Sequence, residues 1–285
     1  AVTGQGHGQA MLEALERANL FTVPLDNERQ WYRYHHLFAD FLRACLHQAR
    51  PEQVPVLHRR ACAWYIENGL ASGAVGHALA AGELELAARL IEQSAPSVVQ
   101  RSEVATLLGW LRALPDELVR TRPFLCVYHA NALLGTGQLD AAEARLQDAE
   151  RCLGAGTGVP SAKTALEKEL PSVQHILNQI LAVRAAIAAS RRDLPLTISL
   201  SRQALERLLD EDEPQRPRIL QNLGAAYWWS DDAVRASETL AEAGKAAEAS
   251  GNVLIAVMAT SQLASVQTVL GRLRQAAKTY QHALQ

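Results

Sequence analysis

Few residues of this chain have types that could do chemistry, and the most suggestive group is a glycine-rich segment. The run GAGTGVPSAKT, residues 154–164, ends in Lys163-Thr164, as a phosphate-binding loop does. Such a loop needs a glycine directly before the lysine, so that the backbone can wrap the phosphates, and a strand in front of it. Ala162 stands at the glycine position and the preceding residues have a helical pattern. We interpret this segment, and the glycine-rich residues 4–8, as loops.

A metal centre and a catalytic nucleophile are not predicted either. His58 and Cys62 are four residues apart on one predicted helix, but zinc needs three or four ligands in a fixed geometry. Neither an HExxH nor a GxSxG pattern occurs in the sequence. The acidic pair Asp231-Asp232 is predicted to cap the helix that follows it, and residues 210–213 to lie in a loop between helices. We expect no enzyme activity, metal or cofactor of the chain's own.

Three consecutive aromatic residues, Tyr227, Trp228 and Trp229, are the candidate ligand-binding residues. Adjacent residues on a helix diverge by about 100°, so both tryptophans cannot share the buried face with Tyr227. At least one should reach the surface, where an aromatic face suits a sugar ring or an apolar ligand. The alternative is that both tryptophans pack against neighbouring helices.

The composition favours packed helices and excludes several classes of protein. Hydrophobic residues make up 48% of the 285 residues and aromatic residues only 5%, and the formal net charge of −2 gives no basic excess for nucleic acid. No apolar run is long enough to cross a bilayer, and the N-terminus has no signal-peptide pattern. The cysteines form no CxxC pair and indicate a reduced, cytoplasmic compartment. They are Cys45, Cys62, Cys126 and Cys152.

The chain lacks an initiator methionine and stops within a helical pattern, so we expect a piece of a longer protein. Its first 50 residues alternate between two periodicities. Residues 9–19 place apolar side chains on one helical face, residues 20–34 are β-formers around an Asp26-Asn27-Glu28 turn, and helical spacing resumes until Pro51. Helix, hairpin and helix form the closing part of a winged-helix unit. From residue 51 to about 122 the pattern is helical, in short pieces.

The most informative feature is an internal repeat. A turn residue is followed by small residues five and twelve positions later, and by a large apolar residue nine positions later. Small side chains let two antiparallel helices touch, and the large one fills the gap to the next pair. Good matches begin at Gly137, Asp231 and Gly271, and weaker ones at Gly82 and Arg192. The weaker units depart from the pattern at Thr197, Ser201 and Ser94. The predicted fold is all-α, a tetratricopeptide-like right-handed superhelix of antiparallel helix pairs.

These segments resemble one protein family. The run LFTVPLDNERQWYRYHHLFADFLRACL is similar to the winged helix of large ATP-binding regulators of the LuxR group, the MalT-like signal-transduction ATPases. HALAAGELELAARLIEQ resembles their helical arm, and the repeats after Arg122 resemble their sensor array. The resemblance implies a winged-helix part at 1–50, an arm at 51–122 and a repeat sensor at 123–285.

The resemblance also implies a function and partners. Such bacterial regulators bind ATP or ADP in an N-terminal domain and DNA through a C-terminal helix-turn-helix, and inducer and ATP together drive self-association. This chain contains neither domain. It would be the region that senses a small-molecule inducer or a regulatory protein and transmits binding to its own nucleotide-binding domain, with no role for a membrane.

One site residue follows from the resemblance. Related ATPases carry a His-Asp pair at the place of YHHLFADFL, and their histidine touches the ADP phosphate. His35 matches that histidine and His36 departs from the aspartate. The resemblance therefore implies that His35 contacts ADP in the full-length protein, whereas its position between strand and helix also fits a capping residue. A freestanding tetratricopeptide scaffold for a peptide or protein is the alternative function, but it gives no reason for the motif RYHHLFADFL.

Overall fold

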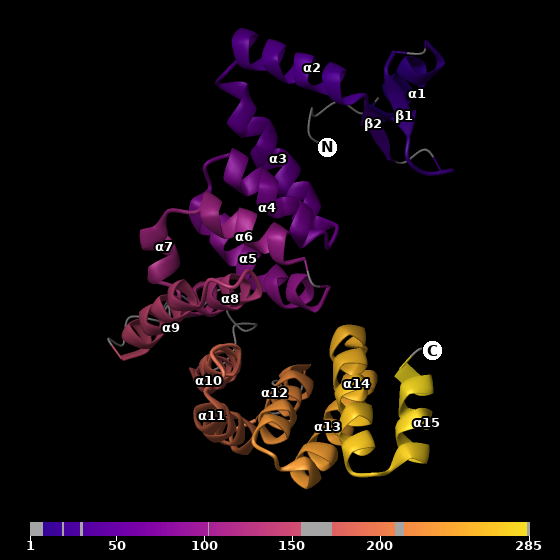
Figure 1. The fold of residues 1–285 in the computed structure, drawn as a ribbon. Coiled ribbons are helices and arrows are strands. Elements are labelled where there is room, and N and C mark those ends of the chain that lie inside the picture. Colours follow the sequence, from indigo (N-terminus) through magenta and orange to yellow (C-terminus); the bar gives the residue numbers. More distant parts are fainter. Residues whose placement is uncertain are drawn as a thin grey trace. The chain divides into compact units, whose positions relative to one another are not determined.

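A computed structural model of the chain describes residues 8–18, 20–28, 31–101, 103–154, 173–208 and 214–283. Over these ranges it contains fifteen helices and one two-stranded antiparallel sheet (Figure 1). Most of the phosphate-loop-like run, residues 155–164, lies outside them, as do residues 4–7 and the acidic run 210–213. The described ends of the glycine-rich segments correct the loop interpretation, because Gly154 ends one helix and Gly8 begins another. None of the helices is both long and apolar enough to span a membrane over the ranges given above.

The chain divides into two compact units, residues 1–94 and 95–285. The boundaries at residues 50 and 122 stay predictions. The first unit opens with the predicted helix, hairpin and helix, and Val23 pairs with Arg33 in the hairpin. These elements are α1 (Gly8–Arg17), β1 (Thr22–Pro24), β2 (Tyr32–Tyr34) and α2 (His36–Ala49).

Two further helices complete the first unit, and a third begins in it and ends in the second unit. They are α3 (Gln53–Glu67), α4 (Ala71–Ala80) and α5 (Leu84–Gln100). Helices α3 and α4 pack against each other, and Gly69 turns the chain between them with φ +70°. A side chain rarely adopts this left-handed conformation, whereas glycine does so at little cost.

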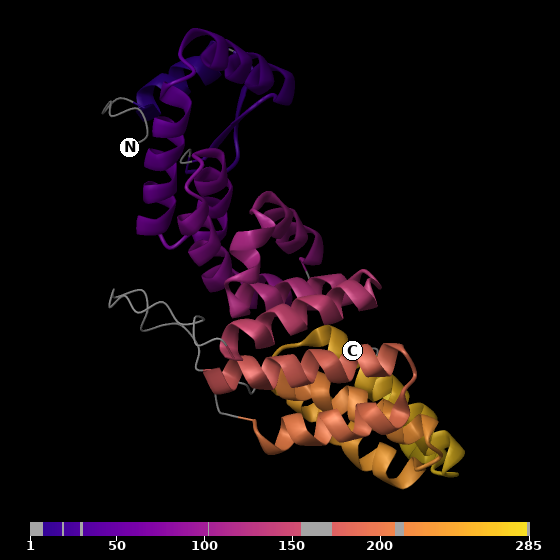
Figure 2. The same ribbon diagram turned by 90° about the vertical axis from the view of Figure 1, so that its left-hand side faces the viewer.

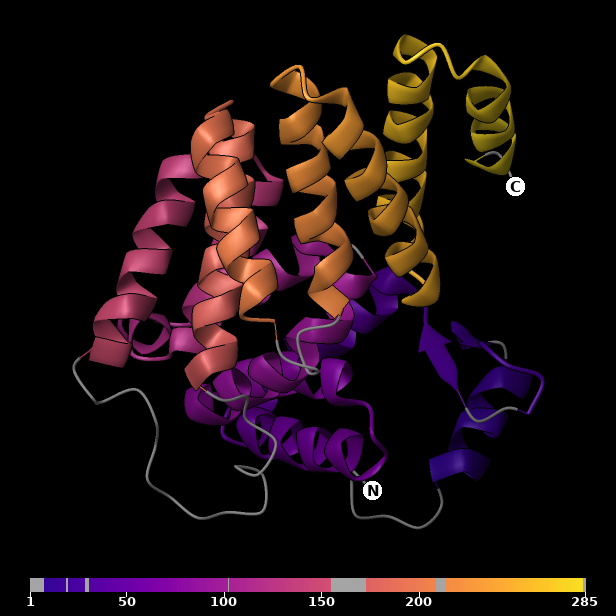
Figure 3. The ribbon, with the colours of Figure 1, turned by 90° about the horizontal axis from the view of Figure 1, so that it is seen from below.

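The second unit is a row of helix pairs. Its helices are α6 (Val104–Ala113), α7 (Asp116–Arg120), α8 (Pro123–Gly135), α9 (Leu139–Gly154), α10 (Val173–Ser190), α11 (Leu194–Glu206), α12 (Arg216–Trp229), α13 (Ala233–Ala249), α14 (Val253–Val269) and α15 (Leu273–Ala283). The pairs α8/α9, α10/α11, α12/α13 and α14/α15 each pack together, and Figures 2 and 3 show the pairs following one another. The predicted helical repeat is confirmed.

The turn positions of the repeat share one backbone conformation. Gly82, Gly137 and Gly271 have φ between +74° and +76°, and Arg192 and Asp231 have φ 60° at the equivalent positions. The small residue five positions after each turn is buried, and these residues are Ala87, Ala142, Thr197, Ala236 and Ala276. Even the departing residues Thr197 and Ser201 are 0% exposed, so the weak unit packs as the strong ones do.

The last repeat differs at its large residue. Tyr280 was predicted to be a core position, but it is 43% exposed. The reason is that α14 is the main neighbour of α15 among the helices described. The Tyr280 hydroxyl hydrogen-bonds the Ser265 hydroxyl instead, at 3.0 Å.

The first and second helices of the pairs form two different layers. Successive first helices, α8, α10, α12 and α14, contact one another along the row. Within the described chain, the second helices α9, α11, α13 and α15 make few or no such contacts with each other. The first helices are therefore on the more tightly curved side, the side that repeat proteins use for binding. We call this the A layer and the other the B layer.

Candidate ligand-binding face of the repeat array

One stripe of α12 faces away from the core of its own pair. Arg218, Asn222, Ala225 and Trp229 recur every three or four residues, which places them on one helical face. Leu223, Gly224 and Tyr227 lie on the other side and are buried. Because α12 belongs to the A layer, the stripe is the part of α12 best placed to meet a ligand.

The three predicted aromatic residues are separated by this geometry. Tyr227 is 5% exposed, and it packs with Leu240 and Val266 in the core. Its hydroxyl accepts a hydrogen bond from Arg202 Nε at 2.9 Å, and the Arg202 and Arg235 guanidinium groups lie over its ring at 5.6 and 5.5 Å. Tyr227 is thus enclosed by contacts that stabilise the helix pair.

The two tryptophans differ from each other as well. Trp228 is partly buried and packs against the same core cluster. Trp229 is 62% exposed, and the Arg192 guanidinium lies over its ring at 5.4 Å. Of the three candidates, Trp229 is the one with most of its side chain at the surface.

Polar side chains connect the A-layer helices to one another. Arg218 Nη1 donates to Asn131 Oδ1 of α8 at 2.9 Å, across the position of α10 in the row. Gln221 Nε2 donates to Gln262 Oε1 of α14 at 3.1 Å. We call Asn131, Arg218, Gln221, Asn222 and Gln262 the A-layer polar cluster. These bonds link α12 to α8 on one side and to α14 on the other.

Two members of the cluster are incompletely satisfied. Burial lowers the pKa of Arg218, and no charged group contributes to that shift. The Asn222 Nδ2 atom is buried and has no hydrogen-bond partner in the described chain. A buried donor without a partner costs free energy, so such an atom requires an explanation such as a bound water, ion or ligand. Sequence reasoning missed both residues, although their spacing of four, opposite Leu223 and Tyr227, was visible.

Two other arginines of the unit have carboxylate partners. Arg184 donates to Glu143 at 2.8 Å and to Glu150 at 2.7 Å, and its hydrogen bond lowers the pKa of Glu150. Arg145 lies 2.7 Å from Asp116 and 3.3 Å from Asp148. The pairs of Arg184 join α10 to α9 and the Arg145–Asp116 pair joins α9 to α7, whereas the Arg145–Asp148 pair lies within α9.

His35 lies at the start of α2 in the first unit, on the exposed surface. Its backbone N–H donates to the Phe21 carbonyl at 2.7 Å, and its ring lies 4.3 Å from that of His36. His35 occupies the N-cap position, but its side chain makes no capping hydrogen bond. The imidazole is therefore not used for capping.

His58 and Cys62 do not form a metal centre with a third ligand, since the described residues contain no group of three that could hold a metal ion. His58 Nδ1 lies 2.9 Å from His77 Nδ1 of α4, and burial lowers the pKa of both histidines. Burial raises the pKa of the Cys62 thiol. The histidine pair joins α3 to α4.

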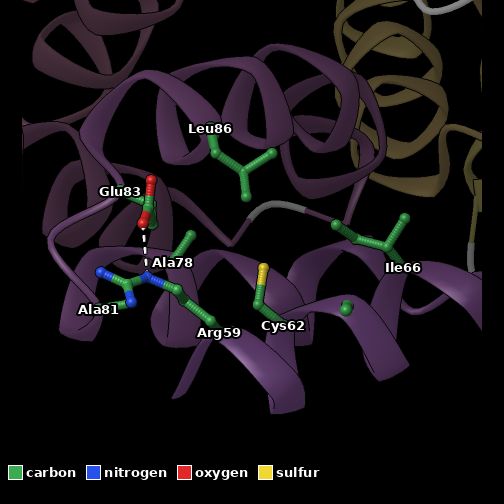
Figure 4. A pocket seen from close by; sticks show the side chains of 8 residues that line it. Arg59, Cys62, Ile66, Ala78, Ala81, Glu83 and Leu86 are labelled. Carbon is green, nitrogen blue, oxygen red and sulfur yellow. Dashed lines mark hydrogen bonds and ion pairs between the residues drawn. The ribbon is translucent and has the colours of Figure 1, made fainter. Parts of the chain in front are cut away.

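A cavity of about 210 Å³ lies beside Cys62 (Figure 4). Leu86 and Ile66 face it, and the ion pair of Arg59 Nε with Glu83 Oε1, 2.7 Å long, lies along one side. Its other lining residues are Ala63, Ala78 and Ala81. With its charges already paired, the cavity offers less to a polar ligand than the A layer does.

Comparisons with known proteins give the chain's relationships. A family profile described as the MalT winged helix domain matches residues 1–54, and one described as the MalT-like TPR region matches residues 178–285. The "Serine/threonine-protein kinase PknK" of Mycobacterium tuberculosis, strain ATCC 25618 / H37Rv, is 40% identical over 157 residues, and PknK of Mycobacterium bovis matches equally. The match covers 53% of this chain but only 14% of either kinase.

The predicted resemblance is confirmed at both ends of the chain. The first profile covers α1, the β-hairpin and α2, and the second covers the A and B layers from α10 onward. The chain is therefore MalT-like, joining a MalT winged helix domain to a MalT-like TPR region.

Proposed function

We propose that this chain is the sensing region of a larger MalT-like, ATP-dependent transcriptional regulator. An inducer or regulatory protein binds to the A layer, and the chain transmits this to a nucleotide-binding domain. The observation that carries the proposal is the polar stripe of α12. Within the described chain its Arg218 has no carboxylate partner and its Asn222 Nδ2 has no hydrogen-bond partner, and Trp229 is exposed on the same stripe. The role of the chain is binding, and catalysis belongs to other domains of the protein.

The mechanism rests on the bonds between A-layer helices. Arg218 links α12 to α8, and Gln221 links α12 to α14. A ligand that replaces one of these hydrogen bonds changes how neighbouring helix pairs pack against each other. It can shift a regulator between two states only if it binds one of them more tightly. A curved row of helix pairs suits this role because each pair contacts mainly its neighbours.

His35 is proposed to contact the ADP phosphate in the full-length protein. Its exposed ring and the absence of a side-chain cap support this proposal. We expect His35→Ala to raise basal activity and to speed ADP release from the full-length protein, with His36→Ala as the matched control. If basal activity and ADP release are unchanged in both variants, His35 has no such role.

The sensing proposal is tested in the intact protein with matched surface variants. The A-layer variant combines Trp229→Ala with Met258→Ala, whose side chains are 62% and 40% exposed. The control combines Glu238→Ala with Lys245→Ala, both exposed on B-layer helix α13. We expect the A-layer variant to lose the response of nucleotide binding to a low-molecular-weight cytosolic fraction, and the control to keep it. Equal responses would overturn the proposal.

A second candidate is the sensing region of a protein kinase, favoured by the 40% identity to PknK. Transfer of radioactive phosphate from ATP to serine by the intact protein would indicate this output. The size of the native protein separates both candidates from a freestanding scaffold. We expect a band far above 31.0 kDa on a blot, and a band at that mass would favour the scaffold.

A further inference from the structure

Arg218 differs from the paired arginines around it. Arg216, two residues earlier, lies 2.6 Å from Glu242, and Arg235 lies 2.9 Å from Asp232. Arg218 makes one hydrogen bond, to the neutral Asn131 side chain, and has no carboxylate partner in the part of the chain that is described. A guanidinium has five N–H donors, so most of those on Arg218 remain available.

The surroundings of Arg218 make an unpaired charge costly. Arg218 is half-buried, and desolvation lowers its pKa with no opposite charge to raise it. Proteins rarely keep a buried charge in this condition, because the penalty is repaid only by an opposite charge or a full set of hydrogen bonds. Arg218 therefore has the features of a cation whose partner is a ligand.

A second donor lies on the same face. Asn222 is one helical turn after Arg218, and its buried Nδ2 has no partner in the described chain. Ala225 follows on the same stripe and contributes only a methyl group. Over the described residues, the Arg218 guanidinium and the Asn222 amide are neighbouring donors of this stripe with hydrogen-bonding capacity to spare, and both groups can recognise anionic oxygen atoms.

We propose that Arg218 and Asn222 bind the carboxylate or phosphate group of a small anionic ligand on the A layer. The guanidinium neutralises the anion, the Asn222 Nδ2 donates to it, and Asn131 holds the guanidinium in place. The proposal rests on the proposed function and narrows it, by giving the inducer a negative charge. It also explains how binding reaches two first helices, since the guanidinium is already bonded from α12 to α8.

The test uses the 285-residue chain with phosphate and succinate as probes, titrated against chloride at constant ionic strength. Arg218→Gln and Arg216→Gln form a matched pair, because the same charge is removed two residues apart on α12. Thermal unfolding is followed for both and for Asn222→Ala. We expect a saturable rise in Tm for the wild type and Arg216→Gln, no rise for Arg218→Gln, and at least a tenfold weaker response for Asn222→Ala.

The unfolding temperature without added anion shows whether each variant still folds. Without added anion, Arg218→Gln should unfold at the wild-type temperature or up to about 5 °C above it, because a desolvated charge is removed. Arg216→Gln should unfold at or slightly below the wild-type temperature. If the rise in Tm saturates at a lower concentration of phosphate than of succinate, the ligand is a phosphate compound. If succinate saturates it at the lower concentration, the ligand is a carboxylate.

Three results would overturn the anion site. They are saturable binding that survives in Arg218→Gln, a response that is identical in all variants, and no saturable response to either anion in the wild type. The sensing proposal is separable from it in the intact protein. If Trp229→Ala with Met258→Ala abolishes the inducer response while Arg218→Gln leaves it intact, the A layer is the sensor but its ligand is not an anion bound by Arg218.

Discussion

Asp231 and Arg192 take the backbone conformation that glycine has in the other repeats. Their φ of 60° lies in the left-handed region, which costs a residue with a side chain about 1 kcal/mol or more. We expect Asp231→Gly to raise the free energy of unfolding by about 0.5 kcal/mol, since relief of strain exceeds the added entropy of the unfolded glycine. Gly137→Ala, at φ +76°, should lower it by about 1 kcal/mol. Urea unfolding measures both, and opposite signs would contradict the shared turn.

His129 of α8 predicts a dependence of stability on pH. Burial, and then the positive charge of Arg145, lowers its pKa from 6.5 to about 4. The folded state therefore prefers the neutral ring, and this contribution is fully present above pH 6.5 and is lost as the pH falls towards 4. Because the ring is partly screened by solvent, we expect a loss of about 1–2 kcal/mol in the free energy of unfolding.

The matched variant for this prediction is His129→Gln, which cannot titrate. Urea unfolding at pH 7.5 and 4.5 should give a smaller difference for the variant than for the wild type. The difference should not vanish, because the pKa values of His58 and His77 are also lowered. An equal difference in the two proteins would show that His129 titrates normally in the folded state.

For single residues, the sequence predicts which side chains share a face of a helix. It does not show which polar atoms lack a hydrogen-bond or charged partner. The helical period separates Tyr227 from Trp229, and the structure has Tyr227 buried and Trp229 exposed. The absence of a carboxylate partner for Arg218 in the described chain depends instead on its neighbour in α8. That neighbour is the uncharged Asn131, 87 residues away in sequence. No local pattern contains that information.

At the scale of elements, Gly224 shows why helices α12 and α13 lie close together. A Cβ atom added there would be 2.7 Å from Leu240 Cγ and 3.3 Å from its backbone nitrogen. Leu240 is fully buried, so it has no room to retreat. Gly109 of helix α6 is a control glycine, because a Cβ atom added there would meet nothing within 4 Å.

These two glycines make a matched prediction. Gly224→Ala should lower the free energy of unfolding by about 1–3 kcal/mol, because overpacking outweighs the helix propensity of alanine. Gly109→Ala should raise it by up to about 1 kcal/mol, since only propensity changes. Thermal unfolding of both variants checks this. A stabilised Gly224→Ala would mean that α12 and α13 are not in close contact.

The helices, the hairpin and the repeat turns could be predicted because each leaves a local periodic signal. Thr197 and Ser201 depart from that signal. The turn at Arg192 and the small residue Ala204 still match the repeat, and both polar residues are buried as the pattern requires. The loop interpretation failed at Gly154, which ends α9, because glycine is also common at helix ends. The position of Tyr280 could not be predicted either, because its exposure depends on which helices pack against α15.

The whole molecule consists of two compact units, which hold different parts of the proposed sensing region. Residues 1–94 contain the winged-helix elements with His35, and residues 95–285 contain the A layer. The profile matches fall in different units, 1–54 in the first and 178–285 in the second. Helix α5 has residues in both units.

We propose that the A layer is the ligand-binding face. Amide hydrogen exchange of the intact protein, measured with and without a low-molecular-weight extract of its native cells, tests this proposal. We expect slower exchange in α10, α12 and α14 when the extract is present, with α11 and α13 unchanged. Protection confined to α11 and α13, or no change in any helix of the array, would contradict it.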